Sequence, residues 1–161
     1  MANTVVLADY HNPTHAQDLV MLLNAYAKDP MGGGEPLSTF TQDNLIKALR
    51  EQPQVLSLIC YVDDKPAGLV NCVKGFSTFS AKPLINIHDV VVLKQFRGLG
   101  ISQLMIQQVE AIAIEHGCCK LTLEVLEGNV VAKAAYKKLG FGGYELDPKM
   151  GQAVFWQKTL S

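Results

Sequence analysis

Two glycines between an apolar run and a helical pattern constrain the fold of this chain more than any other feature. The segment QFRGLGISQLM (residues 95–105) follows the apolar stretch VVVL and precedes apolar residues at helical spacing. Small residues at a strand-to-helix turn indicate that something approaches the backbone closely. Bare N–H groups at a helix start, backed by the positive end of the helix dipole, can bind a pyrophosphate, and Arg97 adds a formal charge.

Two well-known phosphate-binding motifs do not fit this segment. A dinucleotide fingerprint needs a third glycine where Gln103 stands, and a P-loop ends in Gly-Lys-Ser/Thr, which is missing from the sequence. Two interpretations remain. One is a pyrophosphate loop that opens a helix, of the form Gln95-x-x-Gly98-x-Gly100. The other is a tight turn that needs its glycines only for backbone geometry.

The hydrophobic periodicity predicts a single α/β domain over residues 1–161. The expected helices are 14–28, 41–51, 100–116 and 129–139. The expected strands are 4–8, 55–62, 67–76, 84–93, 121–126, 141–146 and 153–160. This order predicts a mixed central sheet of about seven strands flanked by four helices.

Composition excludes several classes of protein. With 48% apolar and 18% charged residues and a net charge of -1, the chain is typical of a soluble globular protein. No basic stripe indicates nucleic-acid binding, no apolar run is long enough for a bilayer, and the N-terminus does not resemble a secretory signal. Because no two cysteines have CxxC spacing, we expect free thiols in a reducing cytoplasm and no metal site.

A second motif lies in residues 123–141, LEVLEGNVVAKAAYKKLGF, which places Asn129, Ala132 and Tyr136 on one short helix. Together with QFRGLG, this motif closely resembles the GNAT superfamily of acetyl-coenzyme A-dependent N-acetyltransferases, and the element order matches along essentially the whole chain. The resemblance implies an enzyme that uses acetyl-CoA as cosubstrate. Its expected acceptor is the primary amine of a small molecule.

The resemblance also implies a role for each matched position. The strand backbone before the glycines would pair with the pantetheine arm and stabilise an oxyanion, and residues 95–102 would wrap the pyrophosphate. Tyr136 would protonate the leaving thiolate; the alternative is a core aromatic. The implied cofactor-binding residues are Val90, Val91, Val92, Gln95, Arg97, Gly98, Leu99, Gly100, Ile101, Ser102, Asn129, Ala132 and Tyr136.

The catalytic base is sought in the strand that precedes the glycines. Alternation places Asn86 and His88 on one face of this strand and Asp89 on the other. Histidine is the side-chain type that exchanges a proton near neutral pH, so His88 is the first candidate base and Asp89 the second. The alternative is that His88 only holds the strand together, through hydrogen bonds to Asp89 or to a backbone carbonyl.

Residues 75–92, GFSTFSAKPLINIHDVVV, are similar to the diamine (polyamine) acetyltransferase branch. That branch carries a Glu-Asp pair where this chain has His88-Asp89, so the support for a dicationic substrate is reduced. Asp29 and Glu35, beside the glycines at 32–34, could attract a cation or be plain loop charges. The glycines themselves suggest a mobile flap or a slack connection.

Two other functions stay open: acetylation of a protein N-terminus or lysine, and a non-catalytic module that binds acyl-CoA. Many members of the resembling family pair through their C-terminal strands. The apolar run Val154-Phe155-Trp156 would form an exposed edge that needs a cover, so we expect a homodimer.

Overall fold

The computed structural model describes residues 1–160 and divides into two compact units, 1–123 and 124–161. The strands are β1 (Asn3–Leu7), β2 (Val55–Val62), β3 (Lys65–Ser77), β4 (Lys82–Val92) and β5 (Leu121–Leu123). The helices are α1 (Pro13–Lys28), α2 (Thr39–Arg50), α3 (Ile101–Glu115) and α4 (Val130–Lys138). Short 3-10 turns lie at Pro30–Gly32, Lys94–Phe96 and Pro148–Met150. All five strands belong to the first unit.

The sheet has the order β1-β2-β3-β4-β5, and its first three pairings are antiparallel. Asp63 and Asp64 have φ values of 47° and 64°, so the β2–β3 hairpin turns through left-handed residues that match the strand twist. The last pairing, β4 with β5, is parallel and requires a crossover, which α3 provides. The mixed α/β architecture expected from the sequence is therefore confirmed.

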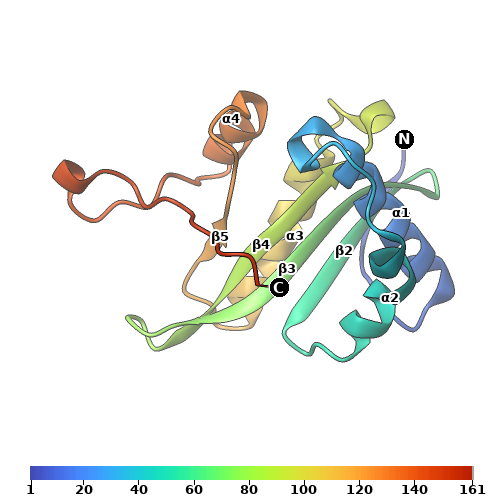
Figure 1. The fold of residues 1–161 in the computed structure, drawn as a ribbon, viewed down its shortest axis with the longest axis horizontal. Coiled ribbons are helices and arrows are strands. Elements are labelled where there is room, and N and C mark those ends of the chain that lie inside the picture. Colours follow the sequence, from blue (N-terminus) through green and yellow to red (C-terminus); the bar gives the residue numbers. More distant parts are fainter. Residues whose placement is uncertain (161) are drawn as a thin grey trace. The chain divides into compact units, whose positions relative to one another are not determined.

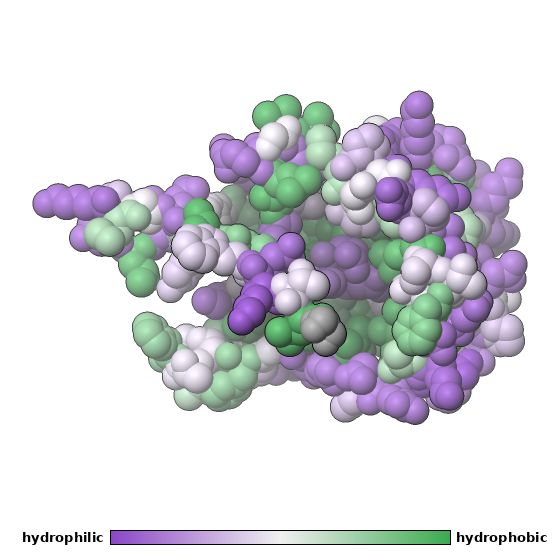
Figure 2. All heavy atoms as spheres, viewed as in Figure 1, coloured by the Kyte–Doolittle hydropathy of each residue, from purple (hydrophilic) through white to green (hydrophobic). Residues whose placement is uncertain are grey.

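Helices cover both faces of this sheet, with α1 and α2 on one face and α3 on the other (Figure 1). Hydrophilic side chains dominate the outer edge over α1 and α2, as Figure 2 shows, because the apolar sides of these helices face inward. The fully or nearly fully buried residues of the core on the α1 face are Leu19, Leu22, Ile59, Leu69 and Val91.

Gly68 explains how closely α3 approaches the opposite face. Neighbouring residues of a strand point to opposite faces, so Leu69 packs in the α1 core while Gly68 faces α3. A Cβ on Gly68 would lie 2.8 Å from Met105 Cε and 2.9 Å from Ile101 Cγ2. Because Gly68 has no side chain, the start of α3 can pack directly on β3.

The sheet has five strands, so the expectation of about seven is wrong. Neither 141–146 nor 153–160 forms a strand: Glu145 of the first segment makes an isolated bridge with Gln152, the residue before the second segment. Gly142 and Gly143 weaken the first segment. In the second segment, Trp156 is 83% exposed. An apolar run forms a strand where a neighbouring strand packs against it, and the described residues provide no such strand there.

None of the helices in residues 1–160 has the length and apolar character that a bilayer crossing requires.

The four cysteines differ strongly in accessibility. Cys60 and Cys72 are buried, Cys118 is half-buried and Cys119 is exposed. Burial raises the pKa of the Cys60 thiol, and burial together with the nearby charge of Asp89 raises the pKa of Cys72 to about 12.

We therefore expect iodoacetamide at pH 8 to alkylate Cys72 at least about 10²-fold more slowly than Cys119, because only the thiolate reacts. Mass spectrometry of peptides from a time course measures both rates. Protein unfolded in guanidinium is the control, and there all four thiols should react alike. Equal rates in the folded protein would contradict the placement of β3.

Candidate functional site

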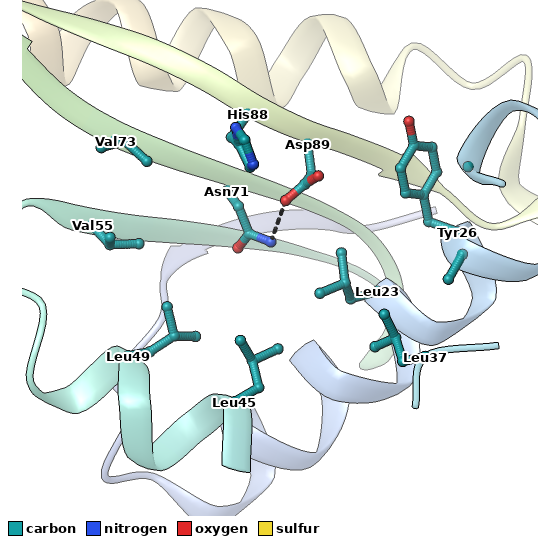
Figure 3. A pocket seen from close by; sticks show the side chains of 12 residues that line it. Leu23, Tyr26, Leu37, Leu45, Leu49, Val55, Asn71, Val73, His88 and Asp89 are labelled. Carbon is teal, nitrogen blue, oxygen red and sulfur yellow. Dashed lines mark hydrogen bonds between the residues drawn. The ribbon is translucent and has the colours of Figure 1, made fainter. Parts of the chain in front are cut away.

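A pocket of about 420 Å³ lies in the first unit, between α1, α2 and the sheet (Figure 3). Most of its wall is aliphatic, formed by Leu23, Leu37, Leu45, Leu49, Val55 and Val73. Its polar groups come from one side chain of α1 and from the two neighbouring strands β3 and β4; they are Tyr26, Asn71, His88 and Asp89. The pocket thus combines a large apolar surface with a few convergent polar groups, as small-molecule sites do.

A bulge in β4 brings both candidate bases into this pocket. Asn71 pairs with Asp89 and Cys72 pairs with Ile87, so His88 is an extra residue on β4. A bulge re-aims the side chains that flank it, and His88 and Asp89 both line the pocket. The expectation that Asp89 faces away from His88 is therefore wrong, because strict alternation fails at the bulge.

A chain of hydrogen bonds orients Asp89 from behind. Ser57 Oγ donates to Asn71 Oδ1 over 2.6 Å, and Asn71 Nδ2 donates to Asp89 Oδ2 over 3.1 Å. The Ser57 hydroxyl has one proton and donates it to Asn71. The Tyr10 hydroxyl, 2.8 Å from Ser57 Oγ, must therefore be the donor in the hydrogen bond between the two hydroxyls. Every donor in the chain points toward Asp89, so its carboxyl group is held as a hydrogen-bond acceptor.

Breaking this series of hydrogen bonds would cost folding free energy, because Ser57 is fully buried and Asn71 is 9% exposed. Losing one partner would leave another buried polar group unsatisfied. Tyr26 adds a neutral hydroxyl to the pocket: burial raises the pKa of its phenol, and the charges of Asp89 and Asp29 raise that pKa further. The charge inside the pocket is therefore the carboxylate of Asp89, beside His88.

His88 is exposed and lies at the surface of the pocket. In residues 1–160 its imidazole has no hydrogen bond to Asp89 or to a backbone carbonyl. The ring is therefore accessible to a ligand and is not engaged in holding the strand.

The glycine loop follows directly from β4. Gly98 and Gly100 have φ values of 81° and 74°, and a Cβ on either would meet no protein atom within 4 Å. Gly100 is the N-cap of α3 and offers no side-chain cap to the N–H groups of the first turn. These positions therefore require a left-handed backbone and leave open space before uncapped donors, which fits a pyrophosphate.

Two of the expected cofactor-binding residues can contribute only their backbone. The Ile101 side chain is 2% exposed and packs toward Gly68, and Val91 belongs to the α1 core with 3% exposure.

Within the first unit, the end of β4 has a free side. Pairing with β5 covers Ile85 to Ile87 and then stops, whereas pairing with β3 continues to Val92. In the first unit, the β5-facing edge of Val90 to Val92 therefore has no strand beside it. An extended ligand can use these backbone groups as another strand would.

Arg97 contacts the protein itself. Its guanidinium lies 3.1 Å from the Asp29 carboxylate, and its Nε donates to the Val92 carbonyl over 3.2 Å. The backbone N–H of Met31, and then Arg97, lower the pKa of Asp29. Exposed pairs of this kind stabilise a fold little, so Arg97 can exchange Asp29 for a phosphate at low cost.

The glycines at 32–34 are held against the end of α1. Gly34 N donates to the Asp29 carbonyl over 3.0 Å, and Glu35 N donates to the Ala27 carbonyl over 3.1 Å. A Cβ on Gly32 would lie 2.0 Å from the Tyr26 carbonyl oxygen, so only glycine fits there. The segment forms part of the pocket wall.

The second unit contains the remaining predicted residues. Asn129 caps α4, because its side-chain oxygen accepts from Ala132 N over 3.2 Å. Tyr136 is half-buried on α4, and its ring meets Phe141 edge-on with centroids 6.1 Å apart.

Sequence reasoning missed Ser57 and Asn71. Each is a polar residue inside an apolar strand pattern, VLSLICYV and AGLVNCV. That pattern was a usable signal, since a buried polar side chain requires a partner.

Comparison with known proteins gives a consistent result. The pattern of the Acetyltransferase (GNAT) family matches residues 19–141. A thialysine N-epsilon-acetyltransferase from Bos taurus is 37% identical over 66 residues, which cover 41% of this chain and 38% of the relative. This chain thus matches well under half of the length of that relative.

Two further proteins are similar over more of their length. An aminoglycoside N(6')-acetyltransferase type 1 from Acinetobacter genomosp. 13 is 29% identical over 103 residues, covering 60% of this chain and 68% of the relative. A solved aminoglycoside acetyltransferase from an uncultured soil metagenomic sample superposes with a TM-score of 0.80 at 18% identity, covering 99% and 97% of the two chains. The latter match supports the fold.

Proposed function

The chain belongs to the acetyltransferase (GNAT) family, and we propose that it moves the acetyl group of acetyl-CoA to the primary amine of a small molecule. The observation that carries this proposal is the course of β4. The strand places His88 and Asp89 in the pocket, and then leads through Val90 to Val92 to the glycine loop. Three extended residues span about 10 Å, a short path between the acceptor and the cofactor loop.

Acetyl-CoA supplies an activated acyl group, and the chain binds it and moves protons. The first turn of α3 and the glycine loop hold the pyrophosphate, and the free edge of Val90 to Val92 holds the pantetheine arm. One N–H of that edge stabilises the oxyanion that develops on the thioester carbonyl. Residues 1–161 act in this scheme as a single catalytic domain.

His88 and Asp89 have different roles toward the amine: one takes up its proton and the other binds it. A carboxylate is a weak base at neutral pH, and Asp89 is already oriented as an acceptor by Asn71. Asp89 therefore binds the incoming ammonium. The accessible imidazole of His88 takes the proton, directly or through one water, so that the neutral amine attacks.

We expect His88→Gln to remove one limb of the pH–rate profile. In the wild type, kcat/KM for the acceptor should rise with pH along a lower limb, where the catalytic base loses its proton, and fall along an upper limb, where the acceptor loses the ammonium that Asp89 binds. Glutamine keeps a polar side chain of similar reach but cannot take up the proton, so the lower limb should be absent. The rate on the plateau should fall by about 10²–10⁴-fold.

Asp89→Asn is the matched control for this profile. It should raise KM for the acceptor and keep the lower limb, since the imidazole is still present. A folded His88→Gln variant with the wild-type profile would exclude His88 as the base.

The proposed function is tested by thiol release from acetyl-CoA. The panel contains small primary amines, thialysine, an aminoglycoside and a lysine peptide, and mass spectrometry identifies the acetylated product. Thiol release with a small amine is the expected result. Release only with the peptide would favour protein acetylation, and CoA binding without release in any mixture would favour a non-catalytic module.

We also propose a homodimer that covers the exposed apolar run Val154-Phe155-Trp156. Light scattering at micromolar concentration should give twice the mass of the chain. Trp156→Lys should shift that mass toward the monomer, and a monomeric wild type would end the proposal.

A further inference from the structure

We propose that the acceptor carries a single positive charge, on the amine that reacts, and that the rest of it is an apolar chain or ring. Diamines and other polycations are then poor substrates. This inference rests on the proposed function and adds the chemical class of the substrate to it.

The charge of the pocket is the first argument. Among the described lining residues, Asp89 carries the one carboxylate. Its Oδ2 accepts from Asn71, which leaves Oδ1 for one ammonium group. Asp29, the C-cap residue of α1, is not among the residues that line the pocket, and its Oδ1 already accepts from Met31 N over 2.9 Å. The pocket therefore has one place for a cation.

The apolar wall of the pocket is the second argument. Leu45 and Leu49 of α2 face Val55 and Val73 of the sheet across the pocket (Figure 3). A second ammonium carried toward this wall would lose hydration and gain no partner. A hydrocarbon chain in the same place would instead remove apolar surface from water on both sides.

The size of the pocket is consistent with such an acceptor. A volume of about 420 Å³ lies at the lower end of the range for small-molecule sites. It accommodates an amine with a hydrocarbon body of several carbons and leaves the reactive nitrogen beside Asp89 and His88.

Matched pairs of amines test the inference on the intact protein. Butylamine and putrescine have the same carbon chain, as do hexylamine and hexamethylenediamine. We expect kcat/KM of each monoamine to exceed that of its diamine by at least tenfold. Two additional methylenes, from butylamine to hexylamine, should raise kcat/KM by about fifteenfold, since each buried methylene contributes about a factor of four.

A charge placed in the wall should invert the preference. Leu49 is half-buried, so Leu49→Asp should still fold, and it should raise the ratio of diamine to monoamine kcat/KM by at least tenfold. Leu49→Asn is the matched control: it makes the wall equally polar without the charge, and should weaken monoamines without favouring diamines.

The outcomes separate this inference from the proposed function. Acetylation of both amine types with diamines preferred by the wild type would overturn the inference and leave the acetyltransferase intact. Equal effects of Leu49→Asp and Leu49→Asn on the ratio of diamine to monoamine kcat/KM would also overturn it, because a charge in the wall would then not affect the choice of amine. Absence of thiol release with every amine would overturn the proposed function itself.

Discussion

Tyr136→Phe is expected to lower kcat by about 10²–10⁴-fold, the usual contribution of a general acid. Phenols ordinarily keep their proton until about pH 10, so tyrosine can donate to a leaving thiolate at neutral pH. Phenylalanine retains the ring that meets Phe141 edge-on and removes only the hydroxyl. Steady-state kinetics measure kcat, and calorimetry should give an affinity for acetyl-CoA close to that of the wild type.

Tyr144→Phe is the matched control, because Tyr144 lies in the same unit and is 54% exposed. Its kcat should equal that of the wild type. Thermal unfolding checks that both variants fold. A kcat for Tyr136→Phe within about twofold of the wild type would contradict the assignment and return Tyr136 to a packing role in α4.

The elements with strong local signals were predictable from the sequence. Residues 55–62 were expected as a strand and form β2 with the same bounds. Their apolar pattern ends at Asp63-Asp64, a pair that readily adopts the left-handed turn of a hairpin. The glycine loop was predictable for the same reason, because Gly98 and Gly100 do adopt positive φ. Local backbone chemistry decides both features.

Features that depend on register were not predictable. Period-two alternation assigned His88 and Asp89 to opposite faces, and one extra residue in β4 overturned that assignment. A bulge is set by how β3 and β4 pair over their whole length, which no short window of sequence contains. The apolar run Val154-Phe155-Trp156 does not form the expected strand for a related reason. Its pattern indicates an apolar segment but does not show which strand it would pair with.

Gly100→Val is expected to abolish measurable binding of CoA while the protein still folds. Gly100 has a φ of 74°, which costs a residue with a Cβ about 1–2 kcal/mol and a β-branched residue more. Relief of that strain would turn the uncapped N–H groups of the first turn of α3 away from the pyrophosphate. Calorimetric titration with CoA measures binding, and thermal unfolding confirms the fold. Unchanged affinity in the folded variant would refute the loop assignment.

Two control variants separate strain from the approach of a ligand. Gly117, just past the other end of α3, has a φ of 72° and equally open space, so Gly117→Val should cost similar stability and leave CoA affinity unchanged. Gly100→Asn should keep the left-handed backbone, which asparagine tolerates, and place a side chain in the space before α3. Loss of CoA binding by Gly100→Asn means that the pyrophosphate needs the bare backbone. Wild-type affinity for CoA in that variant means that only the left-handed turn is required. The glycines are then needed for the backbone conformation of the loop and not for close approach of the ligand.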